Sequence, residues 1–214
     1  MKGAFKAVFF DHDDTLVATK EAKFAQHKHV AKVFYGKELL DKDILPHWGK
    51  PLTELVCLLY DTDDVEEALA KNRLCRDDFP KILFNGTIPT LEALHAQGKL
   101  LGVITATTRN SFEHDLETLQ IPKKLLNYIQ TAEDTQYHKP DARVFEPALR
   151  WLAKRQIEAN EVLYVADGLH DMEAALGAGF RFLGVETGLV THTQFLKHKV
   201  ISIPNIAYLV DGVK

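Results

Sequence analysis

The amino-acid sequence predicts an α/β fold: a doubly wound parallel sheet into which a small all-helical domain is inserted. From residue 85 onward, short apolar segments alternate with segments of helical periodicity, which is typical of βαβ units. Before that point, one strand-like segment at residues 4–10 is followed by a long stretch without β-branched runs. We therefore expect an α/β core of residues 1–17 and 85–214 and a helical domain of residues 18–84.

Each expected strand of the core is a short apolar run bounded by turn-forming residues. The first, AFKAVFF at residues 4–10, is rich in aromatic side chains and ends at an acidic turn. KLLGVIT at residues 99–105 and EVLYVA at residues 161–166 have the apolar character of buried strands. Further strands are expected at residues 128–131, 180–185 and 200–203, and helices at residues 89–98, 109–119, 144–152 and 171–178, with a short helix at the C-terminal end.

The expected helices of the inserted domain carry apolar residues at helical spacing. Residues 20–35 include Phe24, Val30 and Phe34, which recur near one face of a helix. Two more helices are expected from Leu52 to Leu59 and over residues 65–84. The breaks between these helices fall at Gly36, Pro46, residues 49–51 and residues 61–64.

Composition and charge exclude several classes of protein. Of the 214 residues, 46% are hydrophobic and 26% charged, which is the composition of a globular protein rather than of a disordered chain or a coiled coil. A net charge of −4, from 26 basic and 30 acidic residues, predicts no basic face for nucleic acid. No apolar run approaches the roughly 18 residues of a membrane span. We therefore expect neither nucleic acid nor a membrane as a partner.

The two cysteines and the N-terminus indicate a compartment. Cys57 and Cys75 form no CxxC motif and no disulfide framework, which favours the reducing cytoplasm. The apolar run before Asp11 is too short for the apolar region of a signal peptide. A cytoplasmic protein is therefore expected.

Polar and charged side chains follow four of the expected strands, at the point where each strand ends. Residues 11–16 (DHDDTL) follow the first strand, and residues 105–107 (TAT) follow the second. A loop that ends in Lys139 and Pro140 follows the third, and residues 167–171 (DGLHD) follow EVLYVA. Because active sites of open parallel sheets form at the carboxyl ends of strands, we expect these residues to share one site.

These residues resemble the motif set of the haloacid dehalogenase superfamily of phosphatases. The four motifs occur in the family order, as DxDxT at Asp11, Asp13 and Thr15, an apolar strand that ends at Thr105, Lys139, and DxxxD at Asp167 and Asp171. The resemblance covers nearly the whole chain, because the sequence ETG at residues 186–188 also fits. It implies a Rossmann-like core with a helical cap, as in phosphoglycolate phosphatases and β-phosphoglucomutases.

The resemblance also implies a reaction: hydrolysis of a small phosphate monoester with Mg²⁺. Asp11 would attack phosphorus and form an aspartyl-phosphate, since a carboxylate is already ionised near neutral pH. Asp13 would protonate the leaving oxygen and then deprotonate the water that hydrolyses the intermediate. The expected partner is a small phosphorylated metabolite, and we expect the protein to be a monomer or a homodimer.

The remaining motif residues would bind the cation and the phosphate. Oxygen atoms, which Mg²⁺ prefers, would come from Asp11, the backbone carbonyl of Asp13, and Asp167. Thr15 and Asp171 would support these ligands. The phosphoryl oxygens would be bound by Thr105, Ala106 and Lys139, and the ammonium group would also offset the crowded carboxylates.

Between the expected helices of the insertion lies HWGKP, at residues 47–51. In relatives, the corresponding segment of the cap carries substrate specificity, which makes Trp48 and Lys50 candidate substrate-binding residues. The alternative is a plain turn between helices with Trp48 in the core. The sequence alone leaves both interpretations open.

Two positions depart from the family pattern. Asp14 stands where the family usually has glycine, and an aspartate tolerates the left-handed backbone of such a turn better than most residues. We expect its carboxylate to face solvent. Ala166 precedes Asp167 where glycine or an acidic residue is common, and it offers no side-chain ligand.

Other functions remain open at this stage. A sugar-phosphate mutase would use the same Asp11 and Asp13, and it differs in passing the phosphoryl group to a sugar rather than to water. A binding module that has lost activity is disfavoured by the complete set of motif residues. A dehalogenase is disfavoured because that branch of the family lacks the second aspartate.

Overall fold

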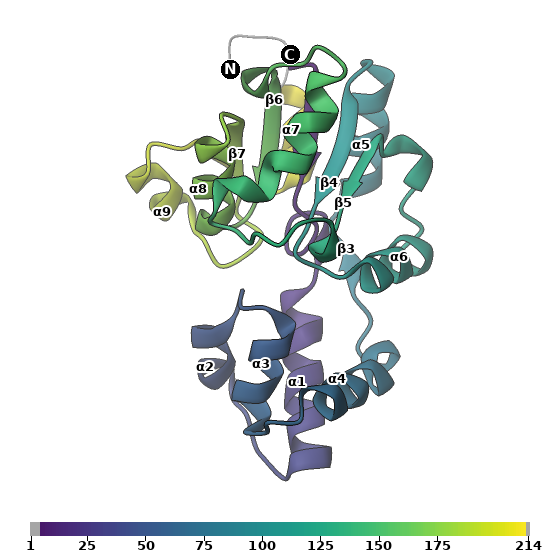
Figure 1. Cartoon of the computed structure of the whole chain (residues 1–214), viewed down its shortest axis with the longest axis vertical. Coiled ribbons are helices and arrows are strands. Elements are labelled where there is room, and N and C mark those ends of the chain that lie inside the picture. Colours follow the sequence, from purple (N-terminus) through teal and green to yellow (C-terminus); the bar gives the residue numbers. More distant parts are fainter. Residues whose placement is uncertain (1–4, 213–214) are drawn as a thin grey trace. The chain divides into compact units, whose positions relative to one another are not determined.

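The computed structural model describes residues 5–212, and the chain divides into two compact units. One unit comprises Met1–Ala18 and Ile82–Lys214, and the other comprises Thr19–Lys81 (Figure 1). The first is an α/β unit, and the second is helical.

The α/β unit is built on a six-stranded sheet in the order β5-β4-β1-β6-β7-β8. Every neighbouring pair in it is parallel. The strands are β1 (Ala7–Phe10), β4 (Leu100–Ile104), β5 (Tyr128–Gln130), β6 (Val162–Ala166), β7 (Arg181–Val185) and β8 (Ser202–Ile203). The chain extends the sheet first on one side of β1 and then on the other. This confirms the doubly wound fold, and the strand order reverses at β1, where open α/β sheets form their ligand-binding crevice at the carboxyl end of the strand.

Helices cover both faces of this sheet (Figure 1). Alternate residues of β1 serve the two cores: Val8 and Phe10 pack on one face, and Ala7 and Phe9 on the other. All four are fully buried, which is why the strand reads as one apolar run. The helices of the unit are α5 (Thr87–Ala96), α6 (Arg109–Thr118), α7 (Glu146–Ala153), α8 (Leu169–Gly177), α9 (His192–Lys197) and α10 (Leu209–Gly212).

The helical unit contains α1 (Lys20–Tyr35), α2 (Asp41–Ile44), α3 (Leu52–Tyr60) and α4 (Val65–Leu74). Helix α1 ends at Gly36, whose φ of 64° is the left-handed conformation that glycine adopts without strain. Helix α4 begins at Asp64, whose side chain accepts a hydrogen bond from the amide of Glu67. The core of the unit packs Phe24, Val30 and other apolar side chains of α1 to α4.

The expected helix over residues 65–84 is wrong in its second half. Helix α4 ends at Leu74, and β3 (Ile82–Leu83) pairs antiparallel with β2 (Val17–Ala18). Pro80 disfavours helical backbone at Phe79, and the short apolar run after it finds a strand partner instead. Helix α9 and the short α2 were not predicted, because neither has a periodic apolar pattern of useful length.

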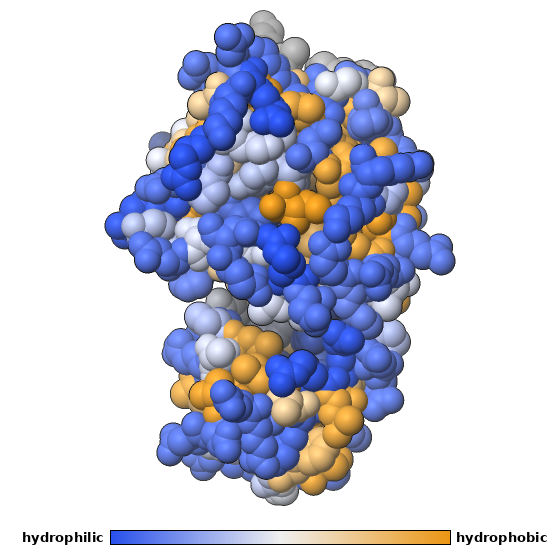
Figure 2. Space-filling view, turned by 45° about the vertical axis from the view of Figure 1, so that its right-hand side comes forward, coloured by the Kyte–Doolittle hydropathy of each residue, from blue (hydrophilic) through white to orange (hydrophobic). Residues whose placement is uncertain are grey.

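Large apolar side chains remain at the surface of the helical unit, which shows extended orange areas in Figure 2. The exposed residues include Leu40, Leu45, Leu52, Leu58 and Leu74. A unit of this size buries a smaller fraction of its apolar surface than a larger domain does. Within residues 5–212, no helix has the length and apolar character needed to span a bilayer.

A buried polar network connects three helices of this unit. His27 of α1 lies with its Nδ1 atom 2.7 Å from the hydroxyl oxygen of Tyr60 in α3, and Asn72 of α4 donates to the same oxygen. Burial lowers the pKa of His27 to about 3, with a further contribution from the nearby charge of Lys23. The imidazole is therefore neutral in the folded protein at neutral pH.

This neutral histidine predicts a loss of stability in acid. Its pKa is about 3 when folded and 6.5 in the unfolded chain, so its contribution is complete above pH 6.5 and is lost as the pH falls from there toward 3. Between pH 7 and pH 5, His27 should account for about 2 kcal/mol of lost unfolding free energy. Denaturant unfolding followed by circular dichroism at both pH values measures this. In His27→Gln, the loss of unfolding free energy between pH 7 and pH 5 should be smaller by about 2 kcal/mol.

The exposed His29 on the same helix supplies the control. Its replacement, His29→Gln, should leave the difference between the two pH values unchanged. An equal acid loss in wild type and in His27→Gln would contradict the assignment of the pH dependence to the buried ring.

Candidate active site

Strand register brings the ends of β1, β4 and β6 to one edge of the sheet. Phe10 pairs with Val103 on one side and with Val165 on the other, so Asp11 emerges beside the last residues of both neighbouring strands. The amide of Asp11 still donates to the carbonyl of Val165, at 2.9 Å. The strand thus delivers the Asp11 carboxylate to the crevice, where the side chain is only 11% exposed.

The turn after Asp11 is organised around one carbonyl group. The carbonyl oxygen of His12 accepts hydrogen bonds from the amides of Leu16 and Val17, at 3.0 and 3.1 Å. At Asp14 the φ angle is 53°, in the left-handed region, as expected for the residue that replaces glycine. The expectation that the Asp14 carboxylate faces solvent is wrong, because the residue is only 3% exposed. The turn folds inward, so the DxDxT segment carries one more buried carboxylate than we expected.

Lys139 joins three groups at the centre of the site. Its Nζ atom donates to Asp11 Oδ1 at 2.7 Å and to the carbonyl of Ile104 at 3.2 Å, and it lies 2.5 Å from Asp171 Oδ1. Burial raises the pKa of Asp11 to about 7; Lys139 opposes this shift and Asp171 adds to it. Burial disfavours the charge of Lys139 too, but the two carboxylates outweigh it and raise the pKa of its ammonium well above the usual value. Lys139 therefore stays charged.

Tyr164 of β6 contacts both Asp171 and Lys139, a role that no sequence motif indicates. Its hydroxyl oxygen lies 2.9 Å from the carbonyl oxygen of Ile104 and 3.2 Å from Asp171 Oδ1. The Nζ atom of Lys139 lies 5.4 Å from the centre of the Tyr164 ring. A fully buried tyrosine within an otherwise apolar strand cannot be distinguished from a core residue by its sequence pattern.

Asp167 and Asp171 occupy space left by two glycines. Asp167 follows β6, and the hydroxyl of Thr15 donates to its Oδ1 at 3.4 Å. A Cβ atom on Gly188 would stand 1.8 Å from Asp167 Oδ2, and one on Gly168 would stand 2.6 Å from Asp171 Oδ2. A side chain at either position would displace the neighbouring carboxylate, and the overlap is larger at Gly188, where the Cγ and Cβ atoms of Asp167 also lie within 2.9 Å of the added atom. The close contact with Asp167 gives a physical reason for the glycine of the ETG sequence at residues 186–188.

The loop after β4 holds the second aspartate of the turn. Thr105 is buried, and its hydroxyl oxygen accepts a hydrogen bond from the amide of Thr107 at 3.0 Å. The hydroxyl of Thr107 donates to Asp13 Oδ2. Sequence analysis singled out Thr105 and Ala106, but it missed Thr107, because a threonine in a loop has no distinguishing pattern.

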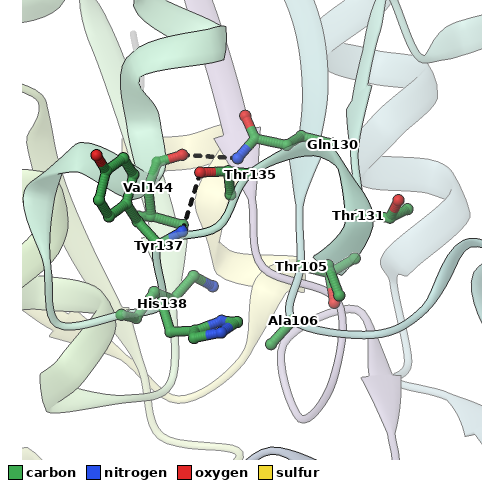
Figure 3. A pocket seen from close by; sticks show the side chains of 10 residues that line it. Thr105, Ala106, Gln130, Thr131, Thr135, Tyr137, His138 and Val144 are labelled. Atoms are coloured by element: carbon green, nitrogen blue, oxygen red, sulfur yellow. Dashed lines mark hydrogen bonds between the residues drawn. The ribbon is translucent and has the colours of Figure 1, made fainter.

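A small cavity of about 20 Å³ lies beside this loop (Figure 3). Thr105, Ala106, Thr131, His138 and Lys139 are among the residues that line it. Its volume suits about one water molecule. The expected phosphate-binding residues Thr105, Ala106 and Lys139 thus border the same small cavity.

The carboxylates of the site outnumber its cations. Burial raises the pKa of Asp167 well above the usual value, and the charges of Asp171, Asp11 and Asp14 raise it further. Such mutual repulsion is what a bound divalent cation would relieve, and carboxylate oxygens are its preferred ligands. The donor set of Asp11, Asp167 and the Asp13 carbonyl therefore fits the expected cation.

The turn residues His12 and Asp13, together with Asp115 of helix α6, form a second group of possible ligand atoms. Single donor atoms of His12, Asp13 and Asp115 all come within 4.8 Å of one another. In this group, however, the Nε2 atom of His12 is already engaged with Asp115 Oδ2 at 2.9 Å. The group at Asp11 and Asp167 is therefore the better candidate metal centre.

Trp48 and Lys50 belong to the helical unit. The ring of Trp48 meets that of Phe24 edge-on with centroids 4.9 Å apart, as in the interpretation that places it in the core. Lys50 forms an ion pair with Glu54 one helical turn further along. Their role in substrate binding stays a prediction.

The four sequence motifs thus meet at one sheet edge, and comparison with known proteins identifies the family of the chain. Residues 8–185 match the family model described as haloacid dehalogenase-like hydrolase. The chain belongs to this family. It is an enzyme of the haloacid dehalogenase-like phosphatases, as the motifs implied.

Individual relatives support the same assignment. The PpaX protein of Clostridium perfringens is 30% identical over 85% of this chain and 84% of its own length, and the pyrophosphatase PpaX of Bacillus cereus is 26% identical over 83% and 82%. A haloacid dehalogenase-like protein of Bacteroides fragilis superposes with a TM-score of 0.80 at 27% identity, covering 96% of this chain and 99% of its own. A predicted phosphoglycolate phosphatase of Haemophilus somnus reaches 0.84 at 20% identity, with both chains fully covered.

For this phosphatase, the glycine at position 188 yields a sharp test of the site. Gly188→Ala would push the Asp167 carboxylate from its place, since the added Cβ would stand 1.8 Å from Oδ2. A displacement of about 1 Å at a reacting centre can cost about 10²-fold in rate, and we expect a loss of this size in kcat. Steady-state phosphate release measures it.

Leu189→Ala, at the exposed neighbour in the same turn, is the matched control and should keep wild-type turnover. Thermal unfolding of both variants separates a local displacement from a loss of fold. Wild-type kcat in Gly188→Ala would mean that the position of Asp167 does not matter for turnover.

Proposed function

We propose that this enzyme hydrolyses a small phosphate monoester in a Mg²⁺-dependent reaction, through an aspartyl-phosphate on Asp11. The observation that carries the proposal is the bond of 2.7 Å between Lys139 Nζ and Asp11 Oδ1 at the carboxyl end of the central strand. A buried carboxylate held by a buried ammonium group at the carboxyl end of a central strand is suited to nucleophilic attack.

Asp11 is the proposed nucleophile. Lys139 engages its Oδ1 atom, which leaves Oδ2 as the oxygen that we assign to attack on phosphorus. The attack forms an O–P bond to Asp11 and breaks the bond from phosphorus to the leaving oxygen. Lys139 neutralises part of the negative charge that accumulates, and Asp171 keeps its ammonium group in place through their ion pair.

Asp13 is the proposed acid and base. It stands two residues after the nucleophile on the turn, and the hydroxyl of Thr107 holds one of its carboxyl oxygens. Its other oxygen would deliver a proton to the leaving oxygen and then take one from the water that cleaves the aspartyl-phosphate. The hydrogen bond from Thr107 orients the Asp13 carboxylate and thereby sets the direction of the proton transfer.

Asp11, the backbone carbonyl of Asp13, and Asp167 would hold Mg²⁺. When bound, the cation supplies charge that neutralises the phosphoryl oxygens. The raised pKa values of Asp11 and Asp167 mean that protons compete for the same carboxylates. Thr15 and Asp171 would orient the ligands, and Thr105, Ala106 and Lys139 would bind the phosphate.

The relatives suggest a second substrate class. The PpaX protein of Bacillus cereus is named as a pyrophosphatase, and pyrophosphate carries the same kind of terminal phosphoryl group on a phosphate leaving group. We propose a small phosphorylated metabolite as the substrate and pyrophosphate as the alternative.

We also propose that the helical domain expected at residues 18–84 acts as a cap. The free cysteines support the further proposal of a cytoplasmic enzyme.

Loss of the nucleophile should abolish turnover. Asp11→Asn keeps the shape of the side chain and removes both the attacking charge and a metal ligand, so kcat should fall by at least ~10³-fold. Phosphate release from an aryl phosphate, an alkyl phosphate and pyrophosphate measures the loss.

EDTA should abolish the activity of the wild-type enzyme. Mg²⁺ should restore this activity better than Ca²⁺, because Ca²⁺ binds more ligands at longer distances.

Asp61→Asn is the control, because Asp61 is an exposed residue of the helical unit with a backbone that asparagine also accepts. Substantial turnover by Asp11→Asn, or full activity of metal-stripped protein in EDTA, would refute the proposal. Transfer of the phosphoryl group to an added sugar phosphate rather than to water would identify a mutase.

Specificity should depend on the segment at residues 47–51. Lys50→Ala removes a cation that would favour a substrate with a second negative charge, and Trp48→Ala removes a large apolar face. We expect kcat/KM for the best physiological substrate to fall by ~10-fold or more, and that for a small aryl phosphate to change much less. Both substrates must be compared within each variant.

Glu54→Ala is the matched control for Lys50, because it releases the ion pair and keeps the cation. It should preserve kcat/KM for the best substrate. Equal losses on both substrates in Lys50→Ala would place substrate specificity elsewhere. Trp48→Ala also loosens the contact with Phe24, so its unfolding must be measured alongside.

A further inference from the structure

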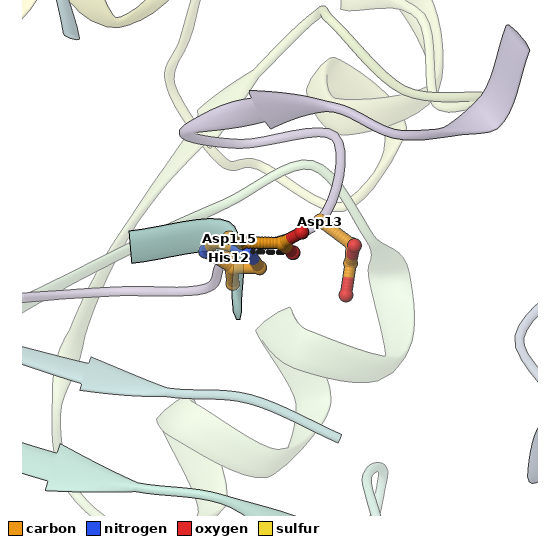
Figure 4. Close-up of side chains that lie close together, drawn as sticks. All are labelled: His12, Asp13 and Asp115. Carbon is orange, nitrogen blue, oxygen red and sulfur yellow. Dashed lines mark hydrogen bonds and ion pairs between the residues drawn. The ribbon is translucent and has the colours of Figure 1, made fainter. Parts of the chain in front are cut away.

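Between the two proposed catalytic aspartates stands a histidine that does not face the crevice. His12 is fully buried, and its Nε2 atom lies 2.9 Å from Oδ2 of Asp115, a residue 103 positions away in helix α6. Asp115 is itself only 5% exposed. The ring meets Phe112 of the same helix edge-on, with centroids 4.9 Å apart. Figure 4 shows the imidazole against the Asp115 carboxylate with Asp13 beside them.

The hydrogen bonding of the ring fixes its orientation. The Nδ1 atom of His12 is buried and has no hydrogen-bond partner among residues 5–212. A proton on Nδ1 would therefore be buried without an acceptor, which is costly. Consequently the proton is on Nε2, which donates a hydrogen bond to the Asp115 carboxylate. A directed bond of this kind sets the angle of the ring, whereas an apolar contact with Phe112 alone would leave it free to rotate.

The backbone of His12 is as constrained as its side chain. Its carbonyl oxygen accepts the amides of Leu16 and Val17, so the turn that carries Asp13 closes upon this residue. A shift of His12 would move the whole turn. The buried pair with Asp115 therefore anchors the origin of the turn to helix α6.

The same helix also reaches Asp13 directly. Thr107, whose hydroxyl donates to Asp13 Oδ2, lies just before Thr108, the residue that caps the N-terminus of α6. Helix α6 and the loop before it thus hold His12 through Asp115 and Asp13 through Thr107. Two attachments to one rigid element define the direction of the Asp13 carboxylate.

We propose that His12 and Asp115 form a positioning pair that aims the Asp13 carboxylate at the leaving-group oxygen. This inference rests on the proposed function of Asp13 as proton donor. Neither member of the pair touches substrate in this scheme. The pair acts through the turn, and its loss should impair proton donation more than attack by Asp11.

Dependence on the leaving group separates positioning from a general structural role. The value of kcat/KM reports the steps up to formation of the aspartyl-phosphate, and only poor leaving groups need the proton of Asp13. The test measures kcat/KM for a series from nitrophenyl phosphate to alkyl phosphates. Replacement of a buried pair by apolar side chains often preserves stability, so the main variant is His12→Leu/Asp115→Leu.

We expect this double variant to lose about 10²-fold in kcat/KM on alkyl phosphates and less than about 3-fold on nitrophenyl phosphate. Asp115→Asn, which keeps an acceptor oxygen for Nε2, is a second variant that should fold in any case and should show a smaller change in the same direction. Phe112→Leu is the control for loosened packing, because it leaves the hydrogen bond intact. Any loss in Phe112→Leu should be uniform across the series.

Asp13→Asn, measured in the same series, separates two kinds of failure. If it shows the leaving-group dependence and both variants of the pair do not, the positioning role is refuted while the proposed function stands. If Asp13→Asn shows no dependence, both fail. A calorimetric titration with Zn²⁺ adds a further outcome: one equivalent bound by wild type and lost in the double variant would make the group a metal site and overturn the proposal.

Discussion

The site depends on the balance of charge between one buried ammonium group and several neighbouring carboxylates. Lys139 binds Asp11 and Asp171 at once, and its charge opposes the rise in the pKa of Asp11 that burial causes. The balance remains incomplete, as the raised pKa values of Asp11 and Asp167 show. The fold therefore maintains an excess of negative charge, which a cation or a proton must offset. A divalent cation bound among these carboxylates would relieve this imbalance.

Precise placement of these charges comes from groups that carry no charge themselves. Gly168 and Gly188 leave the space that two carboxylates fill, and Tyr164 supports the ion pair from inside the sheet. Thr107 and the carbonyl of His12 direct the turn that bears Asp13. The charged residues define the chemistry, and these neutral neighbours define its geometry.

Sequence patterns predicted the parts of this protein that have a strong local cause. Helix α1 begins and ends where apolar spacing and Gly36 indicated, and the motif residues of four strand ends meet because parallel strands share an edge. Three features escaped prediction for a common reason. The strand at Ile82–Leu83 pairs with residues 17–18, the carbonyl of Asp14 accepts a hydrogen bond from Thr187, and His12 pairs with Asp115, so each feature involves a partner distant in sequence. Local periodicity contains no information about such partners.

The two-stranded ribbon of β2 and β3 has a consequence for the modular nature of the chain. Ala18 and Ile82 are register partners, so the polypeptide leaves the α/β unit and returns to it through adjacent residues. Directly opposed residues of an antiparallel pair lie about 5 Å apart, a gap that a two-residue hairpin can close. Everything between them could be shortened, exchanged or removed without changing the length or register of any strand. The insertion point therefore allows one accessory module to be exchanged for another while the strands of the α/β unit keep their length and register.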